Sequence, residues 1–211
     1  MKVVSVNVGL PRDVFADDEW VRTSIWKSPV EGPVPVRLHN LDGDRQSDVR
    51  VHGGRDKAVY AYPSEHYEFW RTELGESELP WGAFGENLTT EGCLEHAVQV
   101  GDRFHLGTAV LQVTQPRLPC FKLGIRFARP DMVKRFLRSG RTGFYLAIVH
   151  EGRLAAGDTI RHEPAAASLT ISELVAVHTT HHPDETTLRR AIDLPFLSEA
   201  WKEQLRKKER A

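Results

Sequence analysis

The sequence predicts a mostly β protein with helices, in which a barrel-like domain spans residues 1–164 and a small three-helix domain spans residues 168–211. In the first part, short apolar alternating runs are separated by glycine-containing turns, which is typical of an antiparallel barrel or sandwich. A proline- and alanine-rich segment at residues 164–168 then breaks the composition. Beyond it, apolar residues recur at helical spacing.

The composition is that of a globular chain with one main core. The chain has 211 residues, 40% of them hydrophobic, and a formal net charge of -1, which gives no reason to expect a nucleic-acid polymer as partner. Residues 1–8 lack the apolar core of a signal peptide, and no run approaches the roughly 20 apolar residues of a membrane span. The two cysteines form neither a disulfide framework nor a zinc-type spacing. We therefore expect a cytoplasmic protein with no membrane contact.

The N-terminal part is expected to contain two strands and an acidic loop. Residues 3–8 alternate like a half-buried strand, and residues 34–38 form a shorter one. We expect this second strand at a sheet edge, because Pro35 cannot donate to a ladder. Residues 41–48 are polar and turn-rich, with three carboxylates. These carboxylates could bind a divalent cation, or the segment could be a solvated loop.

A basic loop with two glycines follows. It consists of His52, Gly53, Gly54, Arg55, Asp56 and Lys57. The glycines allow backbone N–H groups to turn toward an anion, and three basic side chains add positive charge. The loop is therefore suited to a phosphate or an electron-rich heterocycle. Two adjacent glycines before a strand are also typical of a plain hairpin turn.

A helix and a glycine-jointed loop come next. The helix is expected to begin at Pro63 and Ser64. A stripe at helical spacing indicates the core face of this helix; it consists of Tyr67, Trp70 and Leu74. In the loop at residues 81–88, Glu86 and Asn87 could line a pocket. Glu86 could equally be a surface residue.

The second half of the barrel is expected to consist of short strands and one helix. The predicted strands are residues 98–100, 103–106, 108–113 and 144–150, with 153–154 as a hairpin partner of the strand before it and a last strand beginning at residues 157–160. The predicted helix spans residues 130–139, with proline near its start and glycine after its end.

Residues 114–123 hold the main candidate for chemistry. Pro116 and a second proline three residues later should exclude both a helix and continued sheet pairing, so a stiff turn fixes the direction of Cys120. Arg117 and Lys122 flank the sulfur with positive charge, which favours the thiolate, the form that acts as nucleophile and metal ligand. A buried structural cysteine is the alternative.

Three helices are expected in the tail. Thr170 and Glu173 fit a capping box before the first, Asp184 starts the second, and residues 195–208 form the third. The basic residues 206–210 could dock an acidic partner or could be a solvated helix end. Three histidines near the connection between the first two tail helices could bind a metal or lie on the surface. They are His178, His181 and His182.

Four segments, taken in order, resemble those of MOSC-domain proteins, and more narrowly those of the bacterial YiiM-like group. They are residues 41–44, 52–62, 84–88 and 115–120. The resemblance runs from about Val4 to Ile160, and the tail matches the small helical domain that follows in that group. It implies a MOSC-type β-barrel that binds the molybdenum cofactor (molybdopterin with Mo). Binding of pyridoxal phosphate is not expected.

The resemblance also implies roles for residues. Cys120 occupies the position of the metal-ligating cysteine, whereas Cys93 matches no motif cysteine. Arg55 stands where relatives commonly have proline, which removes a source of stiffness and adds a donor suited to phosphate. Candidates for proton transfer are His52, Asp56 and Glu86. The expected cofactor-binding residues are His52, Gly53, Gly54, Arg55, Lys57, Glu86, Asn87, Arg117 and Lys122.

The activity implied by the resemblance is two-electron reduction of N-hydroxylated compounds, such as purine and pyrimidine base analogues, to amines, which detoxifies them. The cofactor carries the redox chemistry. Because the sequence contains no flavin or nicotinamide motif, a separate flavin-containing reductase is expected to supply the electrons.

Other functions and a second copy of the chain remain as hypotheses. A carrier could hold the cofactor, or a persulfide sulfur, on Cys120. A cysteine hydrolase is a third hypothesis, which would need a base paired with that sulfur where the sequence offers cations. The tail could form a homodimer, although apolar helical stripes are also what any small bundle requires.

Overall fold

The computed structural model describes residues 1–47 and 53–210. Its centre is an eight-stranded mixed sheet. The strands are β1 (Lys2–Val8), β4 (Ser28–Pro29), β7 (Val59–Pro63), β8 (Leu88–Glu91), β9 (Arg103–Leu106), β10 (Ala109–Pro116), β11 (Phe144–His150) and β13 (Arg161–Glu163). Their order is β13-β9-β10-β11-β7-β8-β1-β4, and β7 and β8 are the parallel pair.

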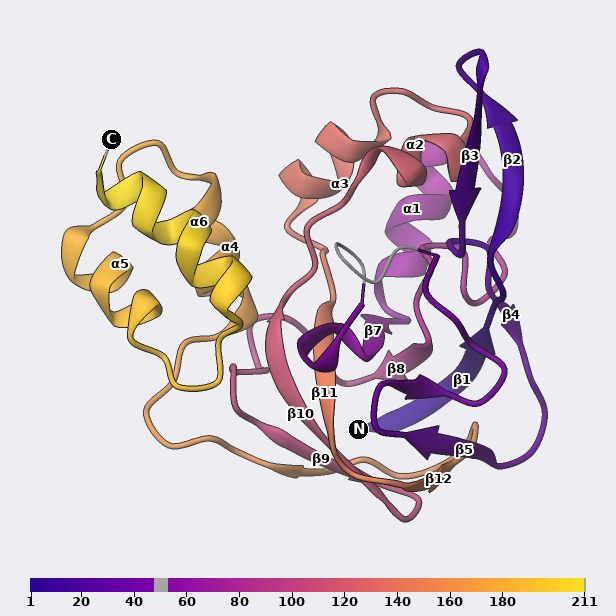
Figure 1. Cartoon of the computed structure of the whole chain (residues 1–211), viewed down its shortest axis with the longest axis horizontal. Helices are drawn as coiled ribbons and strands as arrows, with labels where there is room; N and C mark the ends of the chain where they lie inside the picture. The colour runs from indigo at the N-terminus through magenta and orange to yellow at the C-terminus, as the bar shows by residue number, and fades with distance from the viewer. Residues whose placement is uncertain (48–52, 211) are drawn as a thin grey trace.

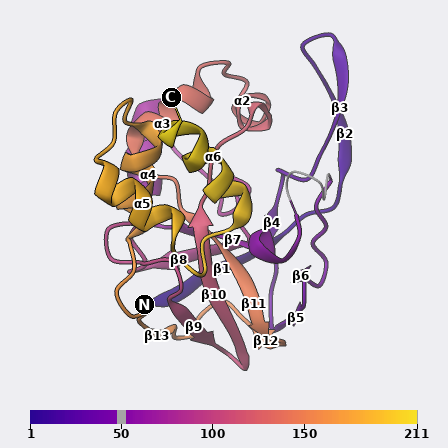
Figure 2. The same cartoon turned by 60° about the vertical axis from the view of Figure 1, so that its left-hand side comes forward.

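Two smaller sheets and the helices complete the fold. β12 (Gly152–Leu154), β5 (Val34–Arg37) and β6 (Asn40–Leu41) form a three-stranded sheet, and β2 (Arg12–Ala16) pairs with β3 (Glu19–Thr23) in a hairpin that projects from the body (Figure 2). The main sheet curls into a half-barrel with helices beside it (Figure 1). The helices are η1 (Arg55–Lys57), α1 (His66–Leu74), α2 (Phe121–Phe127), α3 (Met132–Ser139), α4 (Ile171–Thr179), α5 (Glu185–Ile192) and α6 (Glu199–Glu209). The predicted barrel-like sheet followed by three helices is confirmed.

The predicted pairing was wrong at two strands. β5 is not an edge strand, because β12 pairs with it on one side and β6 on the other. β6 reaches only Val36 and Arg37, so the missing N–H of Pro35 leaves no group of β6 unsatisfied. β12 is not the hairpin partner of β11. A single residue, Glu151, separates these strands, which is too short for a two-residue hairpin turn, and β12 pairs with β5 instead.

Two predictions near the candidate cysteine also need correction. β10 continues through Pro116, which pairs with Phe144 of β11. β9 ends its pairing at Gln112, so Pro116 has a strand on one side only, where proline is tolerated. The sequence did not predict α2, which begins directly after Cys120. A further correction lies elsewhere in the chain. The segment predicted as a strand at residues 98–100 has only an isolated bridge between Gln99 and Thr170.

Two predicted helix N-caps are confirmed, whereas two predicted helix starts are wrong. Thr170 makes the full capping box with Glu173, and the Asp184 side chain accepts from the Thr187 backbone N–H at the start of α5. α6 begins after Ser198 rather than at residue 195. α1 begins at His66, because Pro63 still belongs to β7.

One continuous apolar core joins the tail to the barrel. Leu174, Trp201 and Leu205 from α4 and α6 belong to the same cluster as the apolar residues of the main sheet. The Trp201 indole N–H also donates to the Pro116 carbonyl across 3.2 Å. The tail is therefore fixed to the end of the strand that leads to Cys120. In the part of the chain that the structure describes, no helix has the length and hydrophobicity needed to cross a membrane.

A second, aromatic cluster lies between α1, α3 and the loop at residues 81–88. Its fully buried members include Tyr67, Trp70, Phe84 and Phe136, as the helical spacing of the first two predicted. Glu86 is completely buried beside it, so the surface alternative for this residue is wrong.

The Glu86 carboxylate closes the loop on itself. It accepts hydrogen bonds from the Gly82 N–H at 2.8 Å, the Phe84 N–H at 3.1 Å and the Thr89 hydroxyl at 3.0 Å, and also from the Tyr67 hydroxyl. Burial raises the pKa of Glu86, and the donated hydrogen bonds offset part of that effect. The carboxylate therefore serves as an internal anchor that shapes the loop before β8.

We predict that Trp201→Ala destabilises the whole protein rather than the tail alone. Trp201 is 1% exposed, and truncation of such a side chain costs roughly 3–5 kcal/mol. The measurement is the free energy of unfolding by chemical denaturation. Trp20→Ala is the control, because Trp20 is 71% exposed and should cost about 1 kcal/mol or less through its contact with Phe15. Equal costs for the two variants would contradict the shared core.

We also predict that Glu86→Gln lowers the free energy of unfolding by roughly 1–3 kcal/mol, because the new amide directs N–H donors at groups that already donate. The exposed Glu68 on α1 provides the control, and Glu68→Gln should change stability by about 0.5 kcal/mol at most. A neutral effect of Glu86→Gln would show that the buried carboxylate does not hold the loop.

Candidate functional site

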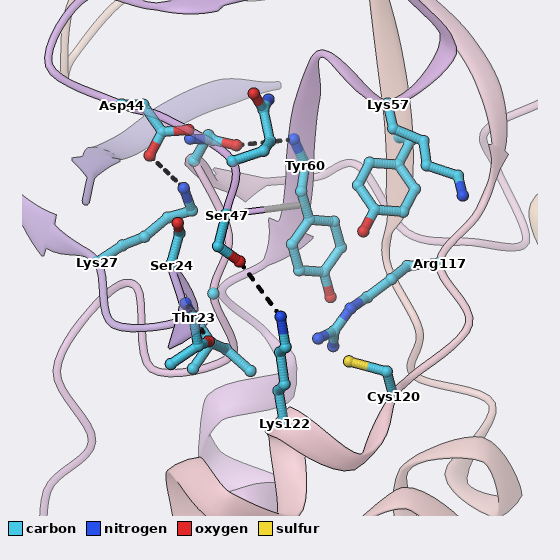
Figure 3. Close-up of a pocket in the computed structure, with 15 residues that line it drawn as sticks. Thr23, Ser24, Lys27, Asp44, Ser47, Lys57, Tyr60, Arg117, Cys120 and Lys122 are labelled. Carbon is cyan, nitrogen blue, oxygen red and sulfur yellow. Dashed lines mark hydrogen bonds and ion pairs between the residues drawn. The ribbon is translucent and has the colours of Figure 1, made fainter. Parts of the chain in front are cut away.

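A cavity with about 590 Å³ of space, part of it open to solvent, lies where β7, β11 and the turn after β10 meet the segments before β4 and after β6. The rings of Tyr60 and Tyr145 form one wall, with centroids 5.3 Å apart. Figure 3 shows the side chains that line it.

Cys120 is half-buried and lines this cavity. Its backbone is extended, with φ -117° and ψ 171°, and it directly precedes α2. The turn is held at both ends, because the Arg117 N–H donates to the Gly143 carbonyl at 3.2 Å and the Leu123 N–H donates to the Cys120 carbonyl at 2.9 Å. Leu123 is fully buried and anchors the first turn of α2. This local structure directs the sulfur into the cavity.

Arg117 lies next to the sulfur (Figure 3). It is 5% exposed, and its guanidinium is 4.8 Å from the ring centre of Tyr60 and 5.1 Å from that of Phe136. Among residues 1–47 and 53–210 no carboxylate forms an ion pair with it, and its Nη1 has no hydrogen-bond partner. Burial disfavours the charged form, but the phenols of Tyr60 and Tyr145 and the Cys120 sulfur outweigh it and hold the pKa of Arg117 above its ordinary value.

Two lysines add to the positive charge around the sulfur. Lys122, in the first turn of α2, donates to the Ser47 hydroxyl at 3.2 Å. Lys57, at the end of η1, also lines the cavity. Burial lowers the pKa of Lys57, and Asp56 opposes that shift. The buried Arg117 guanidinium, whose Nη1 has no partner among the described residues, is a costly arrangement unless an anion completes it, so this side of the cavity is suited to negative charge.

The opposite side of the cavity contains a buried ion pair that no sequence motif predicts. Lys27 donates to the Asp44 carboxylate, which also accepts the Gly9 N–H at 2.9 Å. Figure 3 shows the pair, with Ser24, across the cavity from Cys120. Burial lowers the pKa of Lys27, and Asp44 opposes the shift. Asp44 is one carboxylate of the acidic loop at residues 41–48, whereas Lys27 and Ser24 belong to no recognisable motif.

The structure brings together about half of the predicted site residues. The predicted residues that line the cavity are Lys57, Asn87, Arg117, Cys120 and Lys122. The Asn87 side chain accepts from the Tyr60 N–H at 3.1 Å and donates to the Asn7 carbonyl at 3.3 Å, so it fixes the cavity wall. Gly53, Gly54, Arg55, Asp56 and Glu86 are not among the lining residues. His52 lies outside the described residues.

The basic loop is tied to the strand that leads to Cys120. Gly54 has φ +85° and precedes η1, and the Asp56 carbonyl accepts from the Thr114 hydroxyl at 2.6 Å. The loop therefore presents Lys57 at the cavity, whereas Arg55 and Asp56 do not line it. Cys93 is buried in the main core, away from the cavity-lining set.

The two alternative metal sites, in the acidic loop and at the tail histidines, receive no support from the described residues. Within residues 1–47 and 53–210, no group of three His, Cys, Asp or Glu side chains could hold an ion. In the acidic loop, Asp42 pairs with Arg37 and Asp44 pairs with Lys27. His181 and His182 are exposed, and the ring of His178 packs 5.1 Å from that of Trp201.

Comparison with known proteins places this geometry in a family. The protein YflK of Bacillus subtilis is 38% identical over 209 residues, which cover 98% of this chain and 93% of that protein. Protein YiiM of Escherichia coli is 34% identical over 206 residues, 94% of this chain and 92% of YiiM. A protein of Gibberella moniliformis named reductase is 39% identical over 143 residues, which cover 66% of this chain and 25% of that longer protein.

Comparison with solved structures also relates this chain to YiiM. The crystal structure of YiiM from Geobacillus stearothermophilus superposes with a TM-score of 0.83 at 34% identity, and the match covers 98% of both chains. Residues 48–161, from the end of the acidic loop to the start of the last strand and including Cys120, match the MOSC domain. The chain therefore belongs to the MOSC-domain family, in the group of YiiM and its close relatives.

Proposed function

We propose that this protein binds the molybdenum cofactor in the cavity and uses it to reduce N-hydroxylated compounds, such as hydroxylamino analogues of purine and pyrimidine bases, to amines. MOSC domains are associated with binding of this cofactor in general. The observation that carries the proposal is the joint placement in one cavity of the half-buried Cys120 sulfur and the buried Arg117, which no carboxylate of the described residues pairs with.

The residues present fit the cofactor. A cysteine sulfur is a soft ligand of the kind that binds such metals, and Cys120 lines the cavity with its sulfur turned inward. The cofactor brings sulfur and phosphate groups that carry negative charge, and Arg117, Lys57 and Lys122 supply the matching cations. When bound, the cofactor would supply the two-electron redox chemistry.

The chain itself would contribute binding, orientation and charge. Cys120 would hold the metal in a fixed direction because the turn around it is hydrogen-bonded at both ends. Arg117 would bind an anionic group through Nη1, and the rings beneath it would keep it from turning away. The phenol of Tyr60 donates to the Thr142 carbonyl at 2.8 Å, so this ring is a rigid wall rather than a mobile donor.

Electrons would come from a separate flavin-containing reductase, as the resemblance implies. The relative from Gibberella moniliformis is named a reductase, and its matched part is a quarter of its length. That name favours redox chemistry for the family segment that this chain shares. The open side of the cavity would admit the substrate. A carrier of cofactor or persulfide sulfur uses the same sulfur and cations, so turnover is the property that separates the two functions.

We predict that Cys120→Ser loses molybdenum and activity together. The measurement is metal content per chain after purification from a host that makes the cofactor, followed by reduction of a hydroxylaminopurine with an artificial electron donor. The control is Cys93→Ser, because Cys93 lies in the main core and not in the cavity. Full activity of Cys120→Ser would refute the assignment. Metal binding without turnover in the wild type would favour the carrier.

We predict that Arg117→Met lowers cofactor retention about 10- to 100-fold, which is the loss expected for a buried charge-assisted hydrogen bond. Methionine keeps the apolar contact with Tyr60 and Phe136 but removes the charge. Arg141→Met is the matched control, because Arg141 also stacks on a ring, at 3.9 Å from the centre of Phe69, without lining the cavity. Equal retention in the two variants would contradict the role of Arg117.

A further inference from the structure

The Lys27–Asp44 pair is unusually buried for an ion pair. The exposed fraction of the two side chains is 8% for Lys27 and 1% for Asp44, and burial of two charges is costly even when they meet. Both residues line the cavity, although they come from separate segments that precede β4 and follow β6. Buried charged groups that line a cleft are candidates for binding or chemistry.

The pair does not use all of its hydrogen-bonding capacity. Asp44 Oδ1 accepts from Lys27 and from the Gly9 N–H, but Oδ2 has no partner among the described residues. The hydroxyl of Ser24, on the same side of the cavity (Figure 3), also lacks a partner there. A buried polar atom without a partner carries an energetic penalty, which a ligand in the cavity would relieve.

The charges on the Lys27–Asp44 side of the cavity exclude simple ions as ligands. A lone cation would face the Lys27 ammonium, and a lone phosphate would face the Asp44 carboxylate. What fits is a neutral group that offers an N–H donor to Asp44 beside an acceptor for Lys27. The edge of an amino-substituted pyrimidine ring has this pattern, because its N–H groups adjoin a carbonyl oxygen or a ring nitrogen.

We propose that Lys27, Asp44 and Ser24 form a subsite for the edge of an aminopyrimidine-type ring. Asp44 Oδ2 accepts from a ring N–H or exocyclic amine, Lys27 donates to the neighbouring oxygen or nitrogen, and Ser24 completes the contact. The inference rests on the proposed function for its ligands, because both the pterin of the cofactor and a purine or pyrimidine substrate present this edge. The Cys120 side receives the metal and anionic groups, and the Lys27–Asp44 side recognises the heterocycle.

The test compares Asp44→Asn with Asp102→Asn. Asp102 is a matched control, since it is a buried carboxylate that pairs with a basic side chain, His162, at 2.7 Å and does not line the cavity. The first arm measures pterin and molybdenum per chain in the purified proteins. The second arm measures binding of free pterin, of 2-aminopurine and of purine, which lacks the exocyclic amine, by calorimetry.

Either of two results supports the subsite and identifies its ligand. If it holds the cofactor, Asp44→Asn loses pterin retention and free-pterin binding about 10- to 100-fold, and 2-aminopurine binding is unchanged. If it holds the substrate, retention is unchanged, and 2-aminopurine binding falls by a similar factor while purine binding does not. Equal behaviour of Asp44→Asn and Asp102→Asn in both arms would overturn the proposal.

A further variant separates loss of recognition from loss of folding. Asp44→Asn leaves Lys27 as an unpaired buried charge, whereas the double variant Lys27→Met with Asp44→Asn removes both charges. The double variant should keep the thermal unfolding midpoint of the wild type and still lose the same ligand; normal ligand binding in it would refute the subsite. Absence of molybdenum from the wild type would count against the proposed function alone, because the free-heterocycle arm would still test the subsite.

Discussion

The central constraint in this structure is a buried guanidinium that no carboxylate of residues 1–47 and 53–210 neutralises. Arg117 is stacked between a ring of the sheet, Tyr60, and a ring of α3, Phe136, and one of its terminal nitrogens has no partner among the described residues. Aromatic faces stabilise a cation only modestly, and burial of a charge costs far more. The arrangement is therefore favourable when an anion occupies the cavity beside Cys120, which is why an anionic, metal-bearing cofactor is a fitting ligand.

The scaffold around the cavity keeps this constraint in place. β10 runs into the turn that contains Arg117 and Cys120, and it is supported on its far side by the tail, where the Trp201 indole donates to the Pro116 carbonyl. The Glu86 carboxylate shapes the loop that ends in Asn87, and Asn87 fixes Tyr60 through its backbone N–H. Distant parts of the chain thus determine the direction of one sulfur and one guanidinium, so stability of the core and geometry of the site are linked.

The sequence predicted local features better than pairings. Caps such as Thr170–Glu173 depend on residues three positions apart and were correct. The turn before Cys120 was predicted only in part, because the pairing of β10 continues through Pro116. The partner of β12 depends on the topology of the whole sheet, and α2 was hidden behind two prolines. The same difference applies to the site. Arg117, Cys120 and Lys122 are neighbours in sequence and were found together, whereas Lys27 and Ser24 reach the cavity only through folding and carry no local signal.

The cavity has two chemically different sides, with cations around a sulfur on one and the Lys27–Asp44 pair on the other. This division suits a ligand that is anionic at one end and a neutral heterocycle at the other. The most direct test of the central claim is a crystal structure of cofactor-loaded protein with anomalous data at the molybdenum edge. The account predicts a molybdenum peak within bonding distance of Cys120 Sγ, with an anionic group against Arg117. A molybdenum peak away from Cys120, or a cofactor bound outside this cavity, would contradict it.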